Sequence, residues 1–231
     1  MIDEFHIEAV DADGAVREAA AAVSGDSRLS FLKKAGLGAG ALMGGGAVLS
    51  AFAPGAYAAG TGRPPASFGK GDVGVLNYAL TLEYLEATFY AQAVAGISFS
   101  DAHLGALAKK IAADEKAHVA FLKGALGAKA AKMPKFNFGA TVTNEAKFAA
   151  TAQVLENTGV GAYFGQAFNI AKAADLAAAV SILTVEARHA GAIGYINDMT
   201  AKAVSPSGAF DKPLTAATVL KAVTGTGFIV G

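Results

Sequence analysis

The sequence predicts an all-α protein, an up-down-down-up four-helix bundle with one long crossover and a short C-terminal helix. Frequent alanine, absent tryptophan and few β-branched runs favour helices over sheet. Four long segments repeat apolar residues at helical spacing. The connections within each half of this region are short, whereas the connection between the halves is long.

The helical segments can be placed by their periodicity and by the residues that start and stop helices. Ser100 is a plausible N-cap of the second helix, Thr143 or Asn144 of the third, and Ser205-Pro206 follows the fourth. The expected helices span about 72–95, 101–131, 145–173, 175–203 and, in the C-terminal part, 214–223.

The lengths of the connections predict the topology. About four residues join the first two helices and fewer join the last two, so each pair is expected to be antiparallel. Between the pairs, Lys132–Thr143 contains Pro134 and has no helical pattern. These twelve residues can reach ~40 Å when extended, about the length of a 25-residue helix. The segment is therefore expected to cross the full length of the bundle.

Composition excludes several classes of protein. The 231 residues are 53% hydrophobic and 16% charged, which suits a chain with a sizeable core. The absence of Cys excludes disulfide scaffolds, thiol nucleophiles, cysteine-ligated zinc or iron–sulfur sites and a lipoprotein anchor. Nineteen basic residues balance nineteen acidic ones, so nothing predicts binding to nucleic acid.

The first 58 residues resemble an export signal. Ser27–Lys34 reads SRLSFLKK, similar to the twin-arginine consensus except that Leu29 occupies the second arginine position. A weakly apolar, Gly-rich stretch and the small-residue site Ala56-Tyr57-Ala58 follow. We expect export through the cell's export machinery to the periplasm, envelope or exterior. An uncleaved membrane anchor and a Gly-rich buried helix are the alternatives.

The expected organisation follows from these segments: an export signal, a linker, the bundle, and a tail with a short helix. Their ranges are 1–58, 59–71, 72–204 and 205–231.

Each half of the bundle carries the same polar pattern. Glu-x-x-His occurs at Glu115–His118 and again at Glu186–His189. Glu83 lies 32 residues before Glu115, and Glu156 lies 30 residues before Glu186. A single Glu-x-x-His on a helix is weak evidence, but its repetition with a preceding Glu is specific.

All six residues fall on apolar stripes that are expected to face the bundle interior. Four carboxylates in a dry core are costly unless cations or protons neutralise them. Two divalent ions balance four carboxylates, and the mixture of carboxylate and imidazole ligands suits iron or manganese. A site that keeps the ligands without activity, or a single zinc ion, is the alternative.

With this pattern, residues 72–202 resemble the ferritin-like superfamily of dinuclear carboxylate proteins. More narrowly, Leu76–Glu86 and the tail segment Phe210–Leu214 resemble exported ferritin-like proteins related to plant desiccation-related proteins. The resemblance implies that Glu115 and Glu186 bridge two metals. It also implies terminal ligands on each metal: Glu83 with His118, and Glu156 with His189.

Further residues adjoin this pattern on the first and third helices. Glu86 is the rival of Glu83, but its counterpart in the repeat is Gly159, so symmetry favours Glu83 as the ligand. Tyr90 and Tyr163 recur seven residues after Glu83 and Glu156. They are interpreted either as outer residues that hydrogen-bond the carboxylates or pass electrons, or as core-filling side chains.

Four other polar residues are given no ligand role. Asp114 and Arg188 adjoin the motifs, and solvated surface charge is favoured over a hydrogen bond to a ligand. His6 and His103 lack ligand spacing and are interpreted as ordinary.

Two functions are compatible with this site. The first is redox chemistry on dioxygen or hydrogen peroxide, as a ferroxidase, an oxidase or a catalase-like enzyme. The second is non-enzymatic: an exported bundle that sequesters metal or protects the envelope during stress and drying. A homo-oligomer is compatible with either function. Mineral storage is disfavoured because few carboxylates remain outside the site.

The export signal gives a first prediction. Cleavage after Ala58 should leave a mature chain that begins near Ala59. N-terminal sequencing of the protein from its native host measures this directly. An intact Met1 on most molecules would contradict cleavage.

Overall fold

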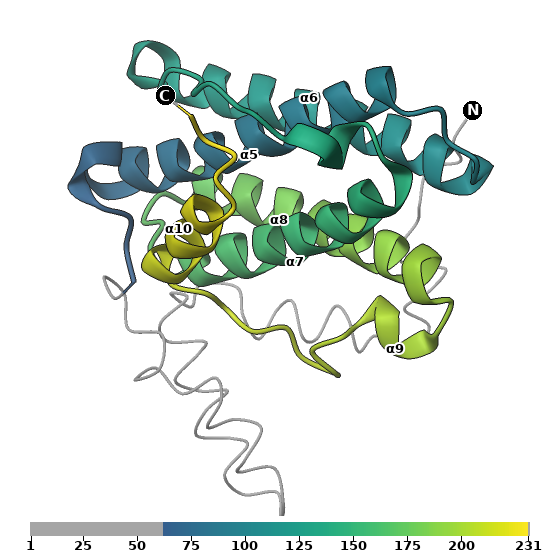
Figure 1. The fold of residues 1–231 in the computed structure, drawn as a ribbon. Coiled ribbons are helices and arrows are strands. Elements are labelled where there is room, and N and C mark those ends of the chain that lie inside the picture. The colour runs from purple at the N-terminus through teal and green to yellow at the C-terminus, as the bar shows by residue number, and fades with distance from the viewer. Residues whose placement is uncertain (1–61, 231) are drawn as a thin grey trace, which may run out of the picture. The chain divides into compact units, whose positions relative to one another are not determined.

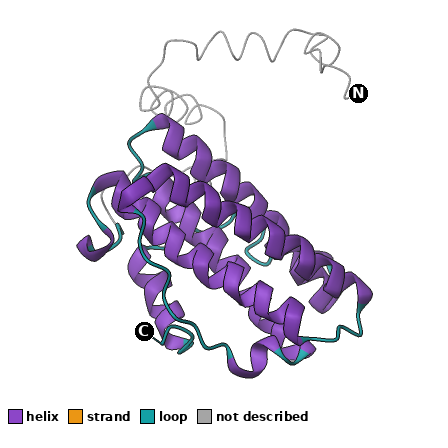
Figure 2. Ribbon diagram, turned by 90° about the horizontal axis from the view of Figure 1, so that it is seen from above, coloured by secondary structure: helices purple, strands orange, loops and turns teal. Residues whose placement is uncertain are grey.

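The computed structural model describes residues 62–230, so the expected export signal and the first three residues of the expected linker lie outside the described residues. Four long helices form the bundle (Figure 1). They are α5 (Gly71–Gly96), α6 (Ala102–Leu126), α7 (Glu145–Ala167) and α8 (Ala173–Asp198). Figure 2 shows these helices side by side along most of their length.

Shorter helical elements connect or follow the long helices. They are η2 (Ala66–Phe68), η3 (Gly127–Lys129), η4 (Gly139–Val142), α9 (Ala201–Val204) and α10 (Ala216–Gly225). Within residues 62–230, β pairing is confined to one isolated bridge between Phe136 and Ile229. The predicted all-α class is therefore confirmed.

The start of α6 differs from its sequence prediction by one residue. Asp101, not Ser100, is the N-cap: its carboxylate accepts hydrogen bonds from the backbone N–H groups of His103 and Leu104, at 2.8 and 3.1 Å. The Ser100 hydroxyl instead donates to Glu145 Oε2 at 2.7 Å. At α7, the prediction of Asn144 as one of two caps is confirmed by its bond from the Lys147 N–H.

Three helix ends were predicted too far along the chain. Helix α6 stops at Leu126 because Gly127 adopts φ +55°, and only a short 3₁₀ turn continues toward 131. Helix α7 stops at Ala167, which leaves a longer connection to α8 than predicted. Helix α8 ends at Asp198, where Met199 takes a left-handed conformation with φ 55°, and α9 is a separate turn.

The core consists of two apolar clusters, and their membership shows the direction of each helix. One cluster includes Leu104 and Phe148, near the starts of α6 and α7. The other includes Leu76 and Ile182, from the first halves of α5 and α8. Helices α6 and α7 therefore run in one direction, and α5 and α8 in the other. This is the predicted up-down-down-up order.

The crossover and the C-terminal segment close one side of the bundle together. The Asn137 N–H donates to the Phe228 carbonyl at 2.8 Å, and the Val230 N–H donates to the Lys135 carbonyl at 2.9 Å. Phe138 and Phe228 meet edge to face, with ring centroids 5.1 Å apart. The crossover is thus held against the bundle by the end of the chain (Figure 1).

Among the described residues, α8 is the helix whose length and composition would also allow it to cross a membrane. Its inner face carries Glu186 and His189, both buried in the bundle. Such apolarity is typical of a helix that supplies one wall of a protein core.

Candidate metal centre

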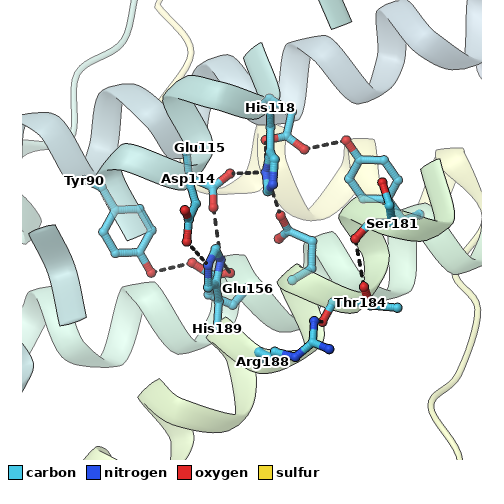
Figure 3. Close-up of polar contacts among 12 residues, drawn as sticks. Tyr90, Asp114, Glu115, His118, Glu156, Ser181, Thr184, Arg188 and His189 are labelled. Atoms are coloured by element: carbon cyan, nitrogen blue, oxygen red, sulfur yellow. Dashed lines mark hydrogen bonds and ion pairs between the residues drawn. The ribbon is translucent and has the colours of Figure 1, made fainter. Parts of the chain in front are cut away.

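Six polar side chains from the four long helices meet halfway along the bundle (Figure 3). Each helix presents them on its buried face because they stand at core positions of its apolar stripe. The four glutamates are fully buried, with no exposed surface. The residues are Glu83 on α5, Glu115 and His118 on α6, Glu156 on α7, and Glu186 and His189 on α8.

These residues form two overlapping groups, each able to hold one metal ion. In each group the ligand atoms lie within 4.8 Å of one another. One group contains Glu83 and His118, the other Glu156 and His189, and both contain Glu115 and Glu186. The arrangement therefore has the two-fold pattern of the sequence, with the two Glu-x-x-His glutamates in common.

The two oxygens of the Glu115 carboxylate face different groups. Its Oε2 lies 3.2 Å from His118 Nδ1, and its Oε1 lies 3.0 Å from His189 Nδ1. His118 Nδ1 is also 3.3 Å from Glu83 Oε2 and 3.4 Å from Glu186 Oε1. The two imidazole centroids are 6.4 Å apart. One oxygen of Glu115 is thus directed to each half, as a bridging carboxylate requires.

Several of these ligand atoms are buried without a hydrogen bond. They include both Glu186 oxygens, Glu83 Oε2, Glu115 Oε1, Glu156 Oε2 and His189 Nδ1. Buried polar atoms are rarely unpaired in proteins. Here the atoms lie close to one another, but no donor is aligned with an acceptor to make a hydrogen bond. Convergent carboxylate oxygens and imidazole nitrogens are the donor set that iron or manganese takes. The six residues therefore fit a pair of metal ions.

Comparison with known protein families agrees with this geometry. The family model described as a ferritin-like domain matches residues 71–198, more than half of the chain. The chain belongs to the ferritin-like domain family. The match spans the four long helices and all six residues of the centre. Comparison with curated proteins gave no match.

Two tyrosines of this ferritin-like domain bond the outer glutamates crosswise between the halves. The Tyr90 hydroxyl on α5 donates to Glu156 Oε1 at 2.5 Å, and the Tyr163 hydroxyl on α7 donates to Glu83 Oε1. Burial raises the pKa of both phenols well above its ordinary value, which keeps the hydroxyls protonated as donors. In each glutamate the other oxygen, Oε2, is left facing a histidine.

Asp114 supports one of the two histidines, so the favoured prediction of a solvated surface charge is wrong for this residue. Its Oδ2 lies 3.1 Å from His189 Nε2, while Lys110 holds the same carboxylate from the solvent side. This bond sets the orientation of the ring and directs Nδ1 into the centre. This contact connects α6 to α8. The residues next to Asp114 in the sequence give no sign of a partner that lies 75 residues away.

Arg188 and His103 agree with their predictions. Arg188 is exposed and donates to the Thr184 carbonyl of its own helix, at 2.9 Å, as Figure 3 shows. His103 is exposed, and His6 lies outside the described residues.

Glu86 is a fifth buried carboxylate, 4% exposed, and belongs to neither metal group. Glu83 and not Glu86 is thus the α5 glutamate that converges with the histidines, as the symmetry of the repeat predicts. Burial and the charges of Glu186 and Glu156 raise the pKa of Glu86 well above its ordinary value.

The pKa values of the centre show how closely the six groups are coupled without metal. Burial raises the pKa of Glu83 to about 8 and also raises those of Glu156 and Glu186. For Glu115, burial is outweighed by the two neighbouring imidazoles, which lower its pKa to about 2. Burial alone would lower the histidine pKa values, but the carboxylates raise them to about 12 for His118 and about 11 for His189.

These values predict that metal uptake releases protons. At neutral pH both imidazoles carry a proton that a metal ion must displace, so at least two protons should leave for each pair of ions. Apparent affinity should therefore rise with pH. Calorimetric titration with Mn²⁺ at about pH 6 and about pH 8, in buffers of different ionisation enthalpy, measures both effects. Equal affinity at the two pH values without proton release would contradict the burial of these groups.

The support of His189 by Asp114 gives a second prediction. The equivalent position in the second half is Val185, so Asp114→Val makes the halves alike. Loss of the bond should weaken the ion on the His189 side about tenfold or more and spare the other ion. The control is Lys110→Met, which leaves the Asp114–His189 bond in place. Unchanged affinity for both ions in Asp114→Val would rule out this positioning role.

Proposed function

We propose that the protein holds two iron or manganese ions and carries out redox chemistry on dioxygen or hydrogen peroxide. The observation that carries this proposal is the convergence of unpaired Glu and His atoms in two groups that have Glu115 and Glu186 in common. Such a pair of ions, when bound, supplies or accepts two electrons at one small molecule.

The chain's own residues have separable tasks in this proposal. Glu115 and Glu186 would join the two ions, because they belong to both groups. Glu83 and Glu156 would each bind through Oε2, because a tyrosine occupies the other oxygen. Tyr90 and Tyr163 are therefore positioning residues that hold these carboxylates at a fixed angle.

Apolar clusters lie on either side of the centre along the bundle and restrict water. Leu80 and Phe89 on α5 and Ile111 on α6 are fully buried. In such surroundings, charges interact more strongly than in water, so fixed carboxylates can tune the ions that they hold. The His118 side chain, 11% exposed, leaves this wall slightly open.

The N-terminal sequence supports a place for this chemistry outside the cytoplasm. The SRLSFLKK motif and the Ala56-Tyr57-Ala58 site are features of an exported protein. We infer that the mature bundle encounters its oxidant in the periplasm, the envelope or the exterior.

Metal analysis combined with an oxidant assay tests the proposal. Purified protein should contain two ions per chain and consume hydrogen peroxide, or consume dioxygen when supplied with Fe²⁺. Glu115→Ala and Glu186→Ala should lose both ions, whereas His118→Ala should weaken mainly one. Two ions retained in Glu115→Ala would contradict the bridging role of this residue.

The same assay addresses the alternative function. Two tightly bound ions with neither peroxide nor dioxygen consumption would instead indicate metal sequestration or a protective role. Thermal melts add an independent measure, because an ion that binds only the folded state stabilises it by about 2.7 kcal/mol at a hundredfold excess over its Kd.

A further inference from the structure

A row of lysines runs along the outer face of α6, the helix that carries Glu115 and His118 on its inner face. Lys109, Lys116 and Lys123 stand seven residues apart, close to two helical turns, so their side chains point to the same side. All three are exposed, and none forms an ion pair with the residues that the structure describes. The row is therefore a line of positive charge without a partner in the described part of the chain.

The basic region continues beyond the end of α6. Three more exposed lysines follow the helix, and they are Lys129, Lys132 and Lys135. The acidic residues between 102 and 144 are Asp114 and Glu115. Glu115 is buried in the metal centre, and Asp114 is already bonded to a lysine and a histidine. No carboxylate on this described stretch is therefore free to neutralise the exposed lysines.

An aromatic side chain lies on the other edge of the same exposed face. At about 100° per residue, Phe121 and the lysine row stand on opposite edges of the outer side of α6. The residues between these edges are small and exposed, and include Ala117 and Ala120. Phe121 is 50% exposed, and Met133, which follows the helix, is 59% exposed. A flat surface could thus touch both the lysines and the aromatic ring.

From this arrangement we propose that the outer face of α6 docks the protein on a membrane surface that contains anionic phospholipids. The lysines would lie among the negative headgroups, which attract clusters of basic residues. Phe121 would enter the boundary between headgroups and acyl chains, as apolar residues of interfacial helices do. The long lysine stems allow this, because they can lie along apolar surface while the ammonium groups stay at the headgroups.

The chemistry of the face favours lipid over a polyanion such as nucleic acid. A half-exposed Phe121 gains from contact with acyl chains. Recognition of single phosphates by geometry relies on arginine, whose planar group pairs with two oxygens at once. The arginines that the structure describes, Arg63 and Arg188, lie outside α6. A layer of mobile headgroups requires only point charges, which lysines supply.

The docking face adjoins the metal centre from the outside. Lys110, on the edge of the face, bonds Asp114, which in turn bonds His189. His118, from the inner face of the same helix, has a side chain that is 11% exposed. Docking would bring this wall of the centre within one helix diameter, about 10 Å, of the headgroups. The docking itself goes beyond the proposed function and does not require bound metal.

Sedimentation with vesicles tests the role of the lysines. Full-length protein should bind vesicles of phosphatidylglycerol and phosphatidylcholine, should bind pure phosphatidylcholine far less, and should be released from the anionic vesicles by salt. Replacing the row by glutamine should lower the partition coefficient on anionic vesicles about a hundredfold. This variant is Lys109→Gln/Lys116→Gln/Lys123→Gln.

A matched control removes the same number of exposed charges from other elements. It alters one lysine each in α9, the tail and α10, as Lys202→Gln/Lys212→Gln/Lys221→Gln. Helix α9 lies on the far side of the bundle from α6 (Figure 1). This control should bind like wild type, because charges far from the surface are screened. Residues 1–58 are the same in all these proteins, so any binding by them cancels in the comparison.

A fluorescent reporter tests the insertion of residue 121. The chain contains no tryptophan, so Phe121→Trp introduces a single one. Its emission should shift to shorter wavelength on anionic vesicles, and phospholipids brominated on their acyl chains should quench it. Val154→Trp, at an exposed position on α7, is the control and should show neither effect. Phe121→Ala should weaken vesicle binding about tenfold.

Three results would overturn the docking. Wild-type protein that fails to bind anionic vesicles would do so, and binding to single-stranded DNA in their place would make the face a nucleic-acid surface. Equal binding by wild type and the α6 lysine variant would assign vesicle binding to another part of the chain. A tryptophan at residue 121 that is neither shifted nor quenched would exclude insertion at this face. Metal analysis tests the metal centre separately, so the two proposals can fail independently.

Discussion

The burial of four carboxylates at one level of the bundle is the constraint on which the rest of the structure depends. Each of these groups alone would be costly in a protein interior. They are tolerated together because two imidazoles lie among them and two tyrosine hydroxyls donate to them. In α6 and α8 the ligands separate the apolar cluster at one end of the helix from that at the other.

Aromatic packing next to the centre accompanies this constraint. Phe89 stacks on Phe148 with ring centroids 5.3 Å apart, and Tyr90 meets the edge of Phe148 at 5.6 Å. Tyr90 is fully buried in this packing, so its hydroxyl can hold Glu156 in one orientation. Aromatic packing at one end of the bundle thus sets the geometry of a polar group at its centre.

The two halves of the centre are similar in their ligands and different in their neighbours. Asp114 supports His189, but Val185 stands at the corresponding place in the second half. Glu86 likewise has Gly159 as its counterpart. A symmetric set of ligands therefore lies in an asymmetric field, so the two ions that it could hold are not equivalent.

The sequence predicted the helices, their order and the convergence of the six polar residues, because these follow from spacing within single helices. It did not show that Asp101 caps α6 or that Asp114 reaches His189 on α8. It also placed the ends of α6 and α7 too late. Two or three neighbouring residues can each cap a helix, so periodicity does not decide which of them does. Contacts between helices depend on how each helix is rotated about its axis, which periodicity does not determine either.

The C-terminal segment is where local sequence reasoning is least informative and the structure adds most. By sequence it is a tail with one short helix, and the family match ends at residue 198. In the structure, Val219 and Val223 of α10 belong to the apolar cluster that contains Tyr90. The Leu214 N–H also donates to the Gly161 carbonyl in the last third of α7, at 2.9 Å.

These contacts make the segment part of the bundle that forms the centre. Gly161 and Gly165 allow it to lie directly against α7, since a Cβ at either position would collide with Leu214. Val223 then forms one wall of a small hollow between α5 and α7 that Glu86 also lines. A chain that ended with the fourth helix would keep all six ligands but lose a wall of this hollow. The surroundings of the centre therefore depend on residues that lie beyond the part of the chain that identifies the family.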